Sequence, residues 1–311
     1  MTEQNQRLGI ALMLGSVLAF SVMDGLSRHL AGTYNVLMVV MIRYWLFAGF
    51  VVALAWRQPN RRAAIATRQP LIHLARAALL IAEICLIVQS YTAIGLGNTH
   101  AVFACCPLII TALSVPILGE RVGWRLWMAI GAGFGGILII LQPGAGMFSL
   151  AALLPLASAL MFGLYSVLTR LATRSEASFV SLFWSAVLGA ILISGIGLWF
   201  WQPMSGVDWG WMLAYGSMAA FGNWLLIRCY AVAEASSVQS FAYLQLVFVT
   251  AIGVIFFGEA IQTHVVVGAM VVVAAGLITI WQARSALLQS GSARRKRQDW
   301  PAQKTSSSRR R

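Results

Sequence analysis

The sequence predicts an all-α integral membrane protein with ten transmembrane helices in two inverted five-helix repeats. Three observations support this prediction: a large excess of apolar residues, ten apolar segments, and an internal repetition of the chain. Of the 311 residues, 59% are hydrophobic and only 10% are charged, and the mean hydropathy is +0.79. Soluble domains are about half apolar and about a quarter charged, so the composition excludes a water-soluble enzyme.

Ten apolar segments are separated by short polar or charged stretches. A helix needs about 20 apolar residues to cross the hydrocarbon core of a bilayer. The repeated alternation of apolar and polar residues that is typical of a membrane barrel is missing from the sequence. We therefore expect transmembrane helices over Leu8–Ser27, Val36–Trp56, Leu71–Ala93, Thr99–Leu118, Trp124–Gln142, Leu150–Thr169, Phe179–Trp201, Trp209–Arg228, Val238–Phe257 and Val265–Trp281.

The basic residues predict the orientation of these helices. With the N-terminus inside, nineteen Lys and Arg residues fall on the inner side, nine of them from Arg284 onward, and only Arg28 falls in an outer loop. This bias is the positive-inside rule, so the net charge of +13 reflects topology and not nucleic-acid binding. We expect a multi-pass protein of the cell inner membrane with both termini in the cytoplasm. The basic tail at 285–311 is expected to be disordered.

The chain repeats itself after about half its length. A shift of 139 residues places Gly119-Glu120 on Gly258-Glu259 and Thr111-Ala112 on Thr250-Ala251. A shift of 142 aligns a set in the first segment with the sixth: Leu18, Phe20, Leu26 and Arg28 with Leu160, Phe162, Leu168 and Arg170. Because each half has an odd number of spans, the second half enters the membrane from the opposite side. Such inverted repeats are typical of secondary transporters.

The stretch TALSVPILGERVGWRLWMAIGAGFGGILIILQPG (Thr111–Gly144), echoed at Thr250–Ile280, resembles the EamA repeat of the drug/metabolite transporter superfamily. The resemblance covers nearly the whole chain apart from the tail. It implies two inverted five-helix repeats, at 1–144 and 145–284, that move small metabolites. Two further stretches, AFSVMDGLSRHL (Ala19–Leu30) and IRYW (Ile42–Trp45), are similar to the branch that carries riboflavin or S-adenosylmethionine.

These features predict a secondary transporter for a small metabolite such as an amino acid, a flavin or a nucleoside-like compound. The sequence has no GxxxxGK[ST] loop for ATP, so we expect transport down a gradient or coupled to H⁺, without a cofactor or a metal. A narrower alternative is uptake of riboflavin or S-adenosylmethionine specifically. An intramembrane enzyme is a more distant alternative, because no Ser/His/Asp or HExxH arrangement occurs.

Ionisable side chains inside the membrane are candidate functional groups, because they are costly to keep there. Asp24 and Arg43 lie at similar depth in the first helical hairpin. We interpret them as an ion pair, or as a proton site at Asp24 that Arg43 tunes. The alternative is a structural pair that only orients the hairpin.

Glu83 lies near the middle of the third segment. Arg76, Glu83 and Ser90 are seven residues apart and share one helical face. We expect Glu83 to face a polar cavity and to bind substrate or a proton, whereas Arg76 alone is readily explained as an anchor at the membrane interface.

Aromatic and amide side chains suit a planar metabolite. Each such side chain could line a cavity or could equally be a polar contact between helices. The candidates are Gln89, Tyr91, His100, Tyr165, Asn223, Tyr243 and Gln245, of which His100 is most simply a polar group near the outer interface.

Helix shape and packing are predicted from Pro and Gly. Pro107 and Pro116 are expected to bend the fourth span. Gly131 and Gly135 form a GxxxG, thickened by Gly133 and Gly136, which permits close approach of a helix. The sequence leaves open whether that partner is the tenth span or a second copy in a homodimer. Glu259 is interpreted as a helix cap or as the partner of an arginine, and Glu120 likewise.

Overall fold

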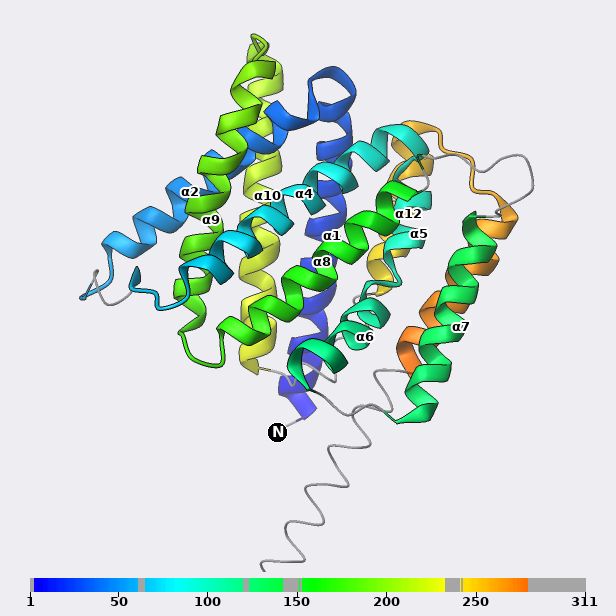
Figure 1. The fold of residues 1–311 in the computed structure, drawn as a ribbon. Coiled ribbons are helices and arrows are strands. Elements are labelled where there is room, and N and C mark those ends of the chain that lie inside the picture. The colour runs from blue at the N-terminus through cyan, green and yellow to red at the C-terminus, as the bar shows by residue number, and fades with distance from the viewer. Residues whose placement is uncertain are drawn as a thin grey trace, which may run out of the picture.

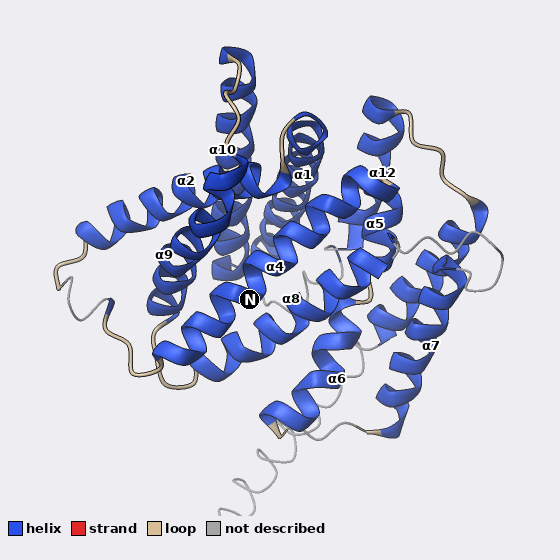
Figure 2. Ribbon diagram, turned by 45° about the horizontal axis from the view of Figure 1, so that its top comes forward, coloured by secondary structure: helices blue, strands red, loops and turns tan. Residues whose placement is uncertain are grey.

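The computed structural model describes residues 3–60, 65–119, 123–141, 151, 153–232, 241 and 243–278. In this part of the chain every regular element is a helix, and no strand occurs (Figure 2). The elements are α1 (Glu3–Thr33), α2 (Val36–Trp56), α4 (Pro70–Ile94), α5 (Leu96–Phe103), α6 (Cys106–Leu118), α7 (Trp124–Leu141), α8 (Leu153–Ala172), α9 (Ser178–Gly197), the 3₁₀ turn η2 (Leu198–Phe200), α10 (Gly206–Val232), α12 (Leu244–Phe257) and a last helix at Thr263–Ile278. The all-helical prediction is confirmed for the described residues.

By length and composition, six helical stretches could cross a membrane: Arg7–Thr33, Val36–Trp56, Pro70–Ile94, Leu96–Leu118, Leu153–Ala172 and Phe179–Phe200. Shorter apolar helices occupy Trp127–Leu141, Leu244–Phe257 and Thr263–Ile278. Every predicted segment contains a helix in its described part, while the count of ten membrane crossings stays a prediction. Tryptophans near helix ends, such as Trp56 and Trp199, are exposed, as side chains anchored at an interface would be.

The predicted fourth span is divided into two helices. α5 ends at Phe103 and α6 begins at Cys106, with Pro107 in the first turn of α6. Proline has no N–H to donate to the carbonyl one turn earlier, so the helix cannot continue unbroken through it. The bend predicted at Pro107 is therefore confirmed, whereas Pro116 lies inside α6.

The bundle is assembled mainly from helices of different predicted repeats. α1 packs along α10, α4 along α8, and α2 along α9 (Figure 1). The shift of 142 relates α1 to α8, and the shift of 139 relates α4 to α10. The contact of α1 with α10 and the contact of α8 with α4 are therefore equivalent to each other under the internal repeat. The repeat boundaries at 144 and 284, and the tail, lie outside the described residues and stay predictions.

Close glycine packing joins α7 to the last helix. A Cβ atom on Gly136 would lie 2.9 Å from the carbonyl oxygen of Gly268, so the two backbones meet only because neither residue has a side chain. The close approach is confirmed at Gly136, with the tenth segment as partner. It is not made by the GxxxG itself, because a Cβ on Gly131 or Gly135 would meet no described atom within 4 Å. A homodimer stays a prediction.

The two ends of the bundle carry different turns (Figure 1). One end, called the N-terminal side, holds the start of α1 and the turn between α8 and α9. The other end, called the opposite side, holds the turn between α1 and α2 and the connection from α9 to α10. By the charge bias, the N-terminal side is the predicted cytoplasmic side.

Candidate functional site

A buried cluster of polar side chains lies where α1, α4, α5 and α12 meet. Asp24 of α1 is 6% exposed. Its Oδ2 atom accepts a hydrogen bond from Gln245 Nε2 at 3.1 Å and lies 3.2 Å from His100 Nε2. The cluster therefore combines a carboxylate, an amide and an imidazole from both predicted repeats.

His100 is held in the cluster by Tyr91, nine residues earlier. The two rings are stacked with centroids 5.6 Å apart and an interplanar angle of 8°. The Tyr91 hydroxyl lies 3.0 Å from His100 Nε2, the same nitrogen that faces Asp24. The chain reverses between them at Gly95, whose φ of 90° favours glycine.

The start of α5 is fixed by a carboxylate from the other predicted repeat. Glu259 accepts hydrogen bonds from the backbone N–H groups of Leu96 at 2.7 Å and Gly97 at 3.1 Å, and it forms an ion pair with Arg28. A carboxylate at a helix start satisfies N–H groups that have no partner within the helix. The predicted capping and arginine pairing of Glu259 are confirmed, although the capped helix is α5. Glu120 lies outside the described residues.

Arg43 and Glu83 form a second polar group near the first. Arg43 Nη1 donates to the Tyr215 hydroxyl at 2.9 Å, and its guanidinium carbon lies 5.3 Å from the centre of that ring. Glu83 is 6% exposed and accepts a hydrogen bond from Ser158 Oγ at 3.3 Å. Glu83 also interacts electrostatically with Arg43 and with Asp24.

The predicted ion pair of Asp24 with Arg43 is not formed in this structure. Among the described residues, Asp24 contacts His100, Gln245 and Tyr91, while Arg43 contacts Tyr215. Equal depth in a hairpin does not fix the direction in which each side chain leaves its helix, which explains the error. By contrast, the face shared by Arg76, Glu83 and Ser90 is buried, as the spacing of seven predicts.

A cavity of about 390 Å³ opens beside the cluster. His100, Gln245, Ser16 and Tyr243 contribute polar groups to its wall, and none of its described lining residues is Lys or Arg. The rest of the wall is aromatic or aliphatic: Met13, Val17, Phe20, Phe103, Ala104, Cys106, Pro107, Ile110, Phe162, Leu226 and Leu246. On α1, Ser16 and Phe20 precede Asp24 by two turns and one turn, so all three share the cavity face.

The remaining predicted candidates do not all reach this cavity. Gln245 and Tyr243 line it, and Tyr91 supports it through His100. Tyr165 is half-buried and lies under the guanidinium of Arg76, with the guanidinium carbon 5.2 Å from its ring centre.

Two predicted cavity residues lie elsewhere. Gln89 and Asn223 are exposed and away from the cavity wall. The Asn223 amide donates to the carbonyl of Ala219 on its own helix at 2.8 Å. These two predictions are not supported by the placement, because a polar side chain on an apolar helix can also face outward. The residues that sequence reasoning missed are Tyr215, Ser158 and Ser16, whereas His100, a predicted cavity candidate, does line the cavity.

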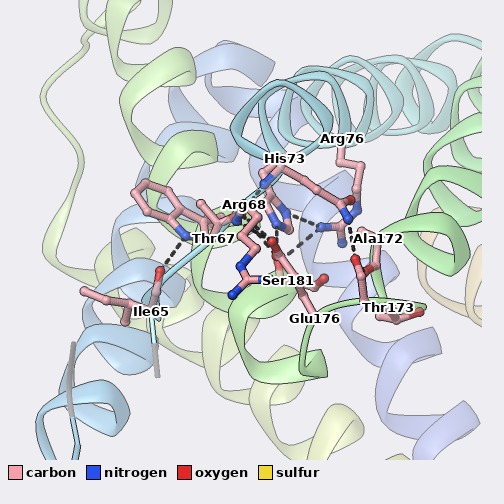
Figure 3. A network of polar contacts seen from close by, with 12 residues as sticks. Ile65, Thr67, Arg68, His73, Arg76, Ala172, Thr173, Glu176 and Ser181 are labelled. Atoms are coloured by element: carbon pink, nitrogen blue, oxygen red, sulfur yellow. Dashed lines mark hydrogen bonds and ion pairs between the residues drawn. The ribbon is translucent and has the colours of Figure 1, made fainter. Parts of the chain in front are cut away.

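A dense polar network, here called the N-side junction, joins the start of α4 to the turn between α8 and α9 (Figure 3). Its acceptor is the Glu176 carboxylate. Glu176 Oε2 lies 2.8 Å from His73 Nε2, and Oε1 accepts from the backbone N–H of Arg68 at 2.6 Å and from Thr67 Oγ1 at 2.9 Å. His73 is fully buried.

The protonation of His73 follows from its second neighbour. Arg76 Nη1 lies 2.9 Å from His73 Nδ1. A guanidinium only donates hydrogen bonds, so Nδ1 accepts and Nε2 carries the hydrogen donated to Glu176. His73 is therefore neutral, and Arg76 supplies the positive charge. Burial alone raises the pKa of Glu176, but the hydrogen bonds from His73, Arg68 and Thr67 outweigh it, and the net effect is a lowered pKa.

Arg76 is buried inside the protein and does not reach its surface, contrary to the anchor interpretation. It is 1% exposed and crosses from α4 to the other predicted repeat. Its Nε donates to Thr169 Oγ1 at 2.9 Å, and Nη1 lies 3.5 Å from the carbonyl oxygen of Ser181.

A smaller network, here called the opposite-side junction, joins the α1–α2 turn to the start of α10. The Tyr34 hydroxyl donates to Asp208 Oδ2 at 2.6 Å and accepts from the backbone N–H of Ser205 at 3.2 Å. Ser205 Oγ also donates to Asp208 Oδ2 at 2.6 Å. The hydrogen bonds from the Ser205 and Tyr34 hydroxyls lower the pKa of Asp208.

With this geometry in place, comparison with known proteins is informative. The model of the EamA-like transporter family matches residues 7–142 and again residues 149–281. The chain belongs to the EamA-like transporter family. The two matches cover nearly the whole chain and agree with the resemblance noted at Thr111–Gly144 and Thr250–Ile280.

Curated relatives of this EamA-like protein are transporters. It is 23% identical to an S-adenosylmethionine uptake transporter of Rickettsia prowazekii (strain Madrid E), over 90% of this chain and 94% of the relative. It is 32% identical to a riboflavin transporter of Rhizobium johnstonii, over 75% of this chain and 78% of the relative. Family and relatives together indicate a multi-pass membrane transporter of small molecules rather than an enzyme.

A solved structure, described only as the crystal structure of a protein, has the same fold. It superposes with a TM-score of 0.57 and 17% sequence identity, covering 92% of this chain and 99% of the other. At this identity the likeness concerns the fold alone.

Proposed function

We propose that this EamA-like protein is a secondary transporter that moves a ring-bearing small metabolite through the cavity beside Asp24, with both termini in the cytoplasm. Transport runs down the substrate gradient or is coupled to H⁺. The candidate substrates are a flavin such as riboflavin, or an adenosine compound such as S-adenosylmethionine, because the similar proteins described above are named as transporters of these two compounds. Amino acids are the third class.

The observation that carries this proposal is the composition of the cavity wall. Phe20, Phe103 and Phe162 provide flat apolar faces, while His100 and Gln245 provide hydrogen-bonding groups. Ligand sites are typically apolar clefts of about 300–1,000 Å³ with a few placed polar groups. A cavity of about 390 Å³ is within this range.

The two junctions support an alternating-access mechanism. Each of them ties a helix start in one predicted repeat to a turn in the other: α4 to the α8–α9 turn, and α10 to the α1–α2 turn. In the proposed cycle, the junction on one side separates when the cavity opens to that side. In inverted-repeat transporters such rocking of one half against the other exposes a fixed site to each side in turn.

The test is flux into proteoliposomes that contain only the purified protein. Labelled riboflavin and labelled S-adenosylmethionine are supplied separately, with and without an imposed pH gradient. We expect protein-dependent uptake of one of them. Equal accumulation in protein-free liposomes for the whole panel, amino acids included, contradicts the proposed function.

Glu83→Gln sharpens this test. The change keeps the shape and the hydrogen bond with Ser158 but removes a titratable carboxyl, so a purely structural Glu83 tolerates it. We expect a folded, inserted variant whose flux is lost or no longer follows the pH gradient. Gln89→Ala is the matched control, since Gln89 lies on the same helix but is exposed away from the cavity. Wild-type flux with unchanged pH dependence in Glu83→Gln removes Glu83 from the mechanism.

A further inference from the structure

The charges around the cavity are unevenly balanced. Arg43 and Glu83 are electrostatic neighbours, and the Arg43 guanidinium donates its hydrogen bond to Tyr215 and not to Asp24. Asp24 has a different environment: its carboxylate contacts Gln245 and the Tyr91 hydroxyl, which are uncharged, and His100, which is charged only when protonated. Whether the charge of Asp24 is balanced therefore depends on whether a positively charged group lies beside it, either protonated His100 or a bound cation.

A carboxylate in a membrane interior keeps its charge only with a nearby positive charge, because desolvation is otherwise too costly. Among the described groups near it, protonated His100 is the one placed to supply that charge, with Nε2 3.2 Å from Asp24 Oδ2. Gln245 contributes a dipole but no net charge.

Other titratable and charged groups surround the cluster of Asp24 and His100. These are Asp24 from α1, Arg43 from α2, Glu83 and Tyr91 from α4, Cys105 and Cys106 from the α5–α6 bend, Tyr215 from α10 and Tyr243 at the start of α12. Arg43 is the arginine of this set, and its guanidinium donates a hydrogen bond to the Tyr215 hydroxyl. It does not replace His100 as the partner of Asp24.

His100 is also in the path of a ligand. His100 and Gln245 are both part of the cavity wall, and Asp24 lies directly behind them. The described wall has no Lys or Arg to repel a cation, while Phe20, Phe103 and Phe162 present aromatic faces to it. Aromatic faces attract cations through their quadrupole.

We infer that the cavity selects a substrate with a positively charged group, and that this group exchanges with the proton on His100. When the cavity is empty, protonated His100 balances Asp24. When the cationic group binds beside Asp24, His100 releases its proton to water and turns aside, so the net charge of the site is unchanged. The inference rests on the proposed function and narrows it to cation–proton exchange with ring-bearing cations such as sulfonium or ammonium compounds.

The test measures binding and proton release together. Purified protein in a weakly buffered detergent solution is titrated with S-adenosylmethionine, a sulfonium, and separately with riboflavin, which is neutral, while a pH dye follows released protons. We expect S-adenosylmethionine to release one proton per site. Its affinity should fall by about tenfold for each unit by which the pH is lowered, over the range in which the proton competes with it. Riboflavin should release none.

Two variants separate the roles of the pair. Asp24→Asn should weaken binding of the sulfonium by about tenfold or more, since a charge-assisted contact is lost. His100→Gln keeps a donor toward Asp24 but has no proton to exchange, so binding should remain and its pH dependence should flatten. His264→Gln, on the last helix outside the cavity wall, is the matched control and should behave as wild type.

The outcomes distinguish this inference from the proposed function. Absent binding of S-adenosylmethionine, binding without proton release, or an unchanged pH slope in His100→Gln overturns the inference. Riboflavin flux with wild-type rates in Asp24→Asn also overturns it, while leaving the proposed function intact. Binding of the sulfonium with proton release but without flux of any probe supports the inference and contradicts the proposed function.

Discussion

The two junctions occupy equivalent places in the two halves of the chain but are built very differently. A shift of 142 takes Tyr34 to Glu176, and a shift of 139 takes Gln69 to Asp208. Each junction thus pairs the same turn with the same helix start. The N-side junction has a fully buried histidine and a buried arginine, whereas Ser205 of the opposite-side junction is exposed and Asp208 half-buried.

The two junctions differ in the free-energy cost of separating them. Separation of the N-side junction leaves the neutral His73 and the charged Arg76 without their partners in a buried place, and unsatisfied buried groups are costly. Separation of the opposite-side junction returns a phenol and a carboxylate to water, where they are readily solvated. We therefore expect the opposite-side junction to open more easily, so that the resting protein faces the predicted exterior.

Glu176→Ala has the largest expected effect on this comparison. It removes the acceptor for Thr67, Arg68 and His73, and leaves the buried His73 N–H without a partner. We expect a loss of about 1–3 kcal/mol in the free energy of unfolding, seen as a lower melting temperature in detergent. Unchanged stability would show that the N-side junction does not hold the two halves together.

Acid should weaken the same junction in wild-type protein. Because the pKa of Glu176 is lowered in the folded state, its contribution is fully present above the ordinary glutamate pKa. That contribution is lost as the pH falls through the lowered pKa. We expect the difference in melting temperature between wild type and Glu176→Gln to shrink from pH 7 to about pH 3. A difference that stays constant over this range would mean that the charge of Glu176 is irrelevant.

Asp208→Asn should have the smallest effect. The hydrogen bonds from Tyr34 and Ser205 can be made to an amide oxygen as well, and the site is open to solvent. We expect the melting temperature to change less than in Glu176→Ala, measured under the same conditions. An equal or larger decrease would contradict the proposed asymmetry between the junctions.

The helices could be predicted well because hydropathy and the distribution of charge can be read from each segment of the sequence without knowledge of its neighbours in space. The helical class, the bend at Pro107 and the buried face with Glu83 all follow from patterns within one segment. The sequence also predicted that Asp24 and Gln245 are candidates, since polar groups in apolar segments are few. The family model matches each half of the chain separately, in agreement with the internal repeat, because both are detected from similarity between stretches of sequence.

Contacts between segments were beyond sequence reasoning. Asp24 and Arg43 share a depth, but the rotation of each helix directs them to different partners. Glu176 lies in a loop, where an acidic residue looks like ordinary solvent-exposed charge, and its binding to His73 depends on helix packing across the repeats. Gln89 and Asn223 failed as cavity candidates for the same reason, since helix orientation decides whether a polar side chain faces inward.

The most direct test of the account is a reversible lock on each junction in turn. In a chain whose four cysteines are replaced by alanine, cysteine pairs at positions 73 and 176, or at 34 and 208, are joined by a bifunctional thiosulfonate reagent and assayed for flux in proteoliposomes. If the cavity is exposed alternately through the two junctions, either cross-link stops transport and reduction restores it, while the reagent leaves the cysteine-free chain active. Continued transport with either junction fully cross-linked would contradict the account.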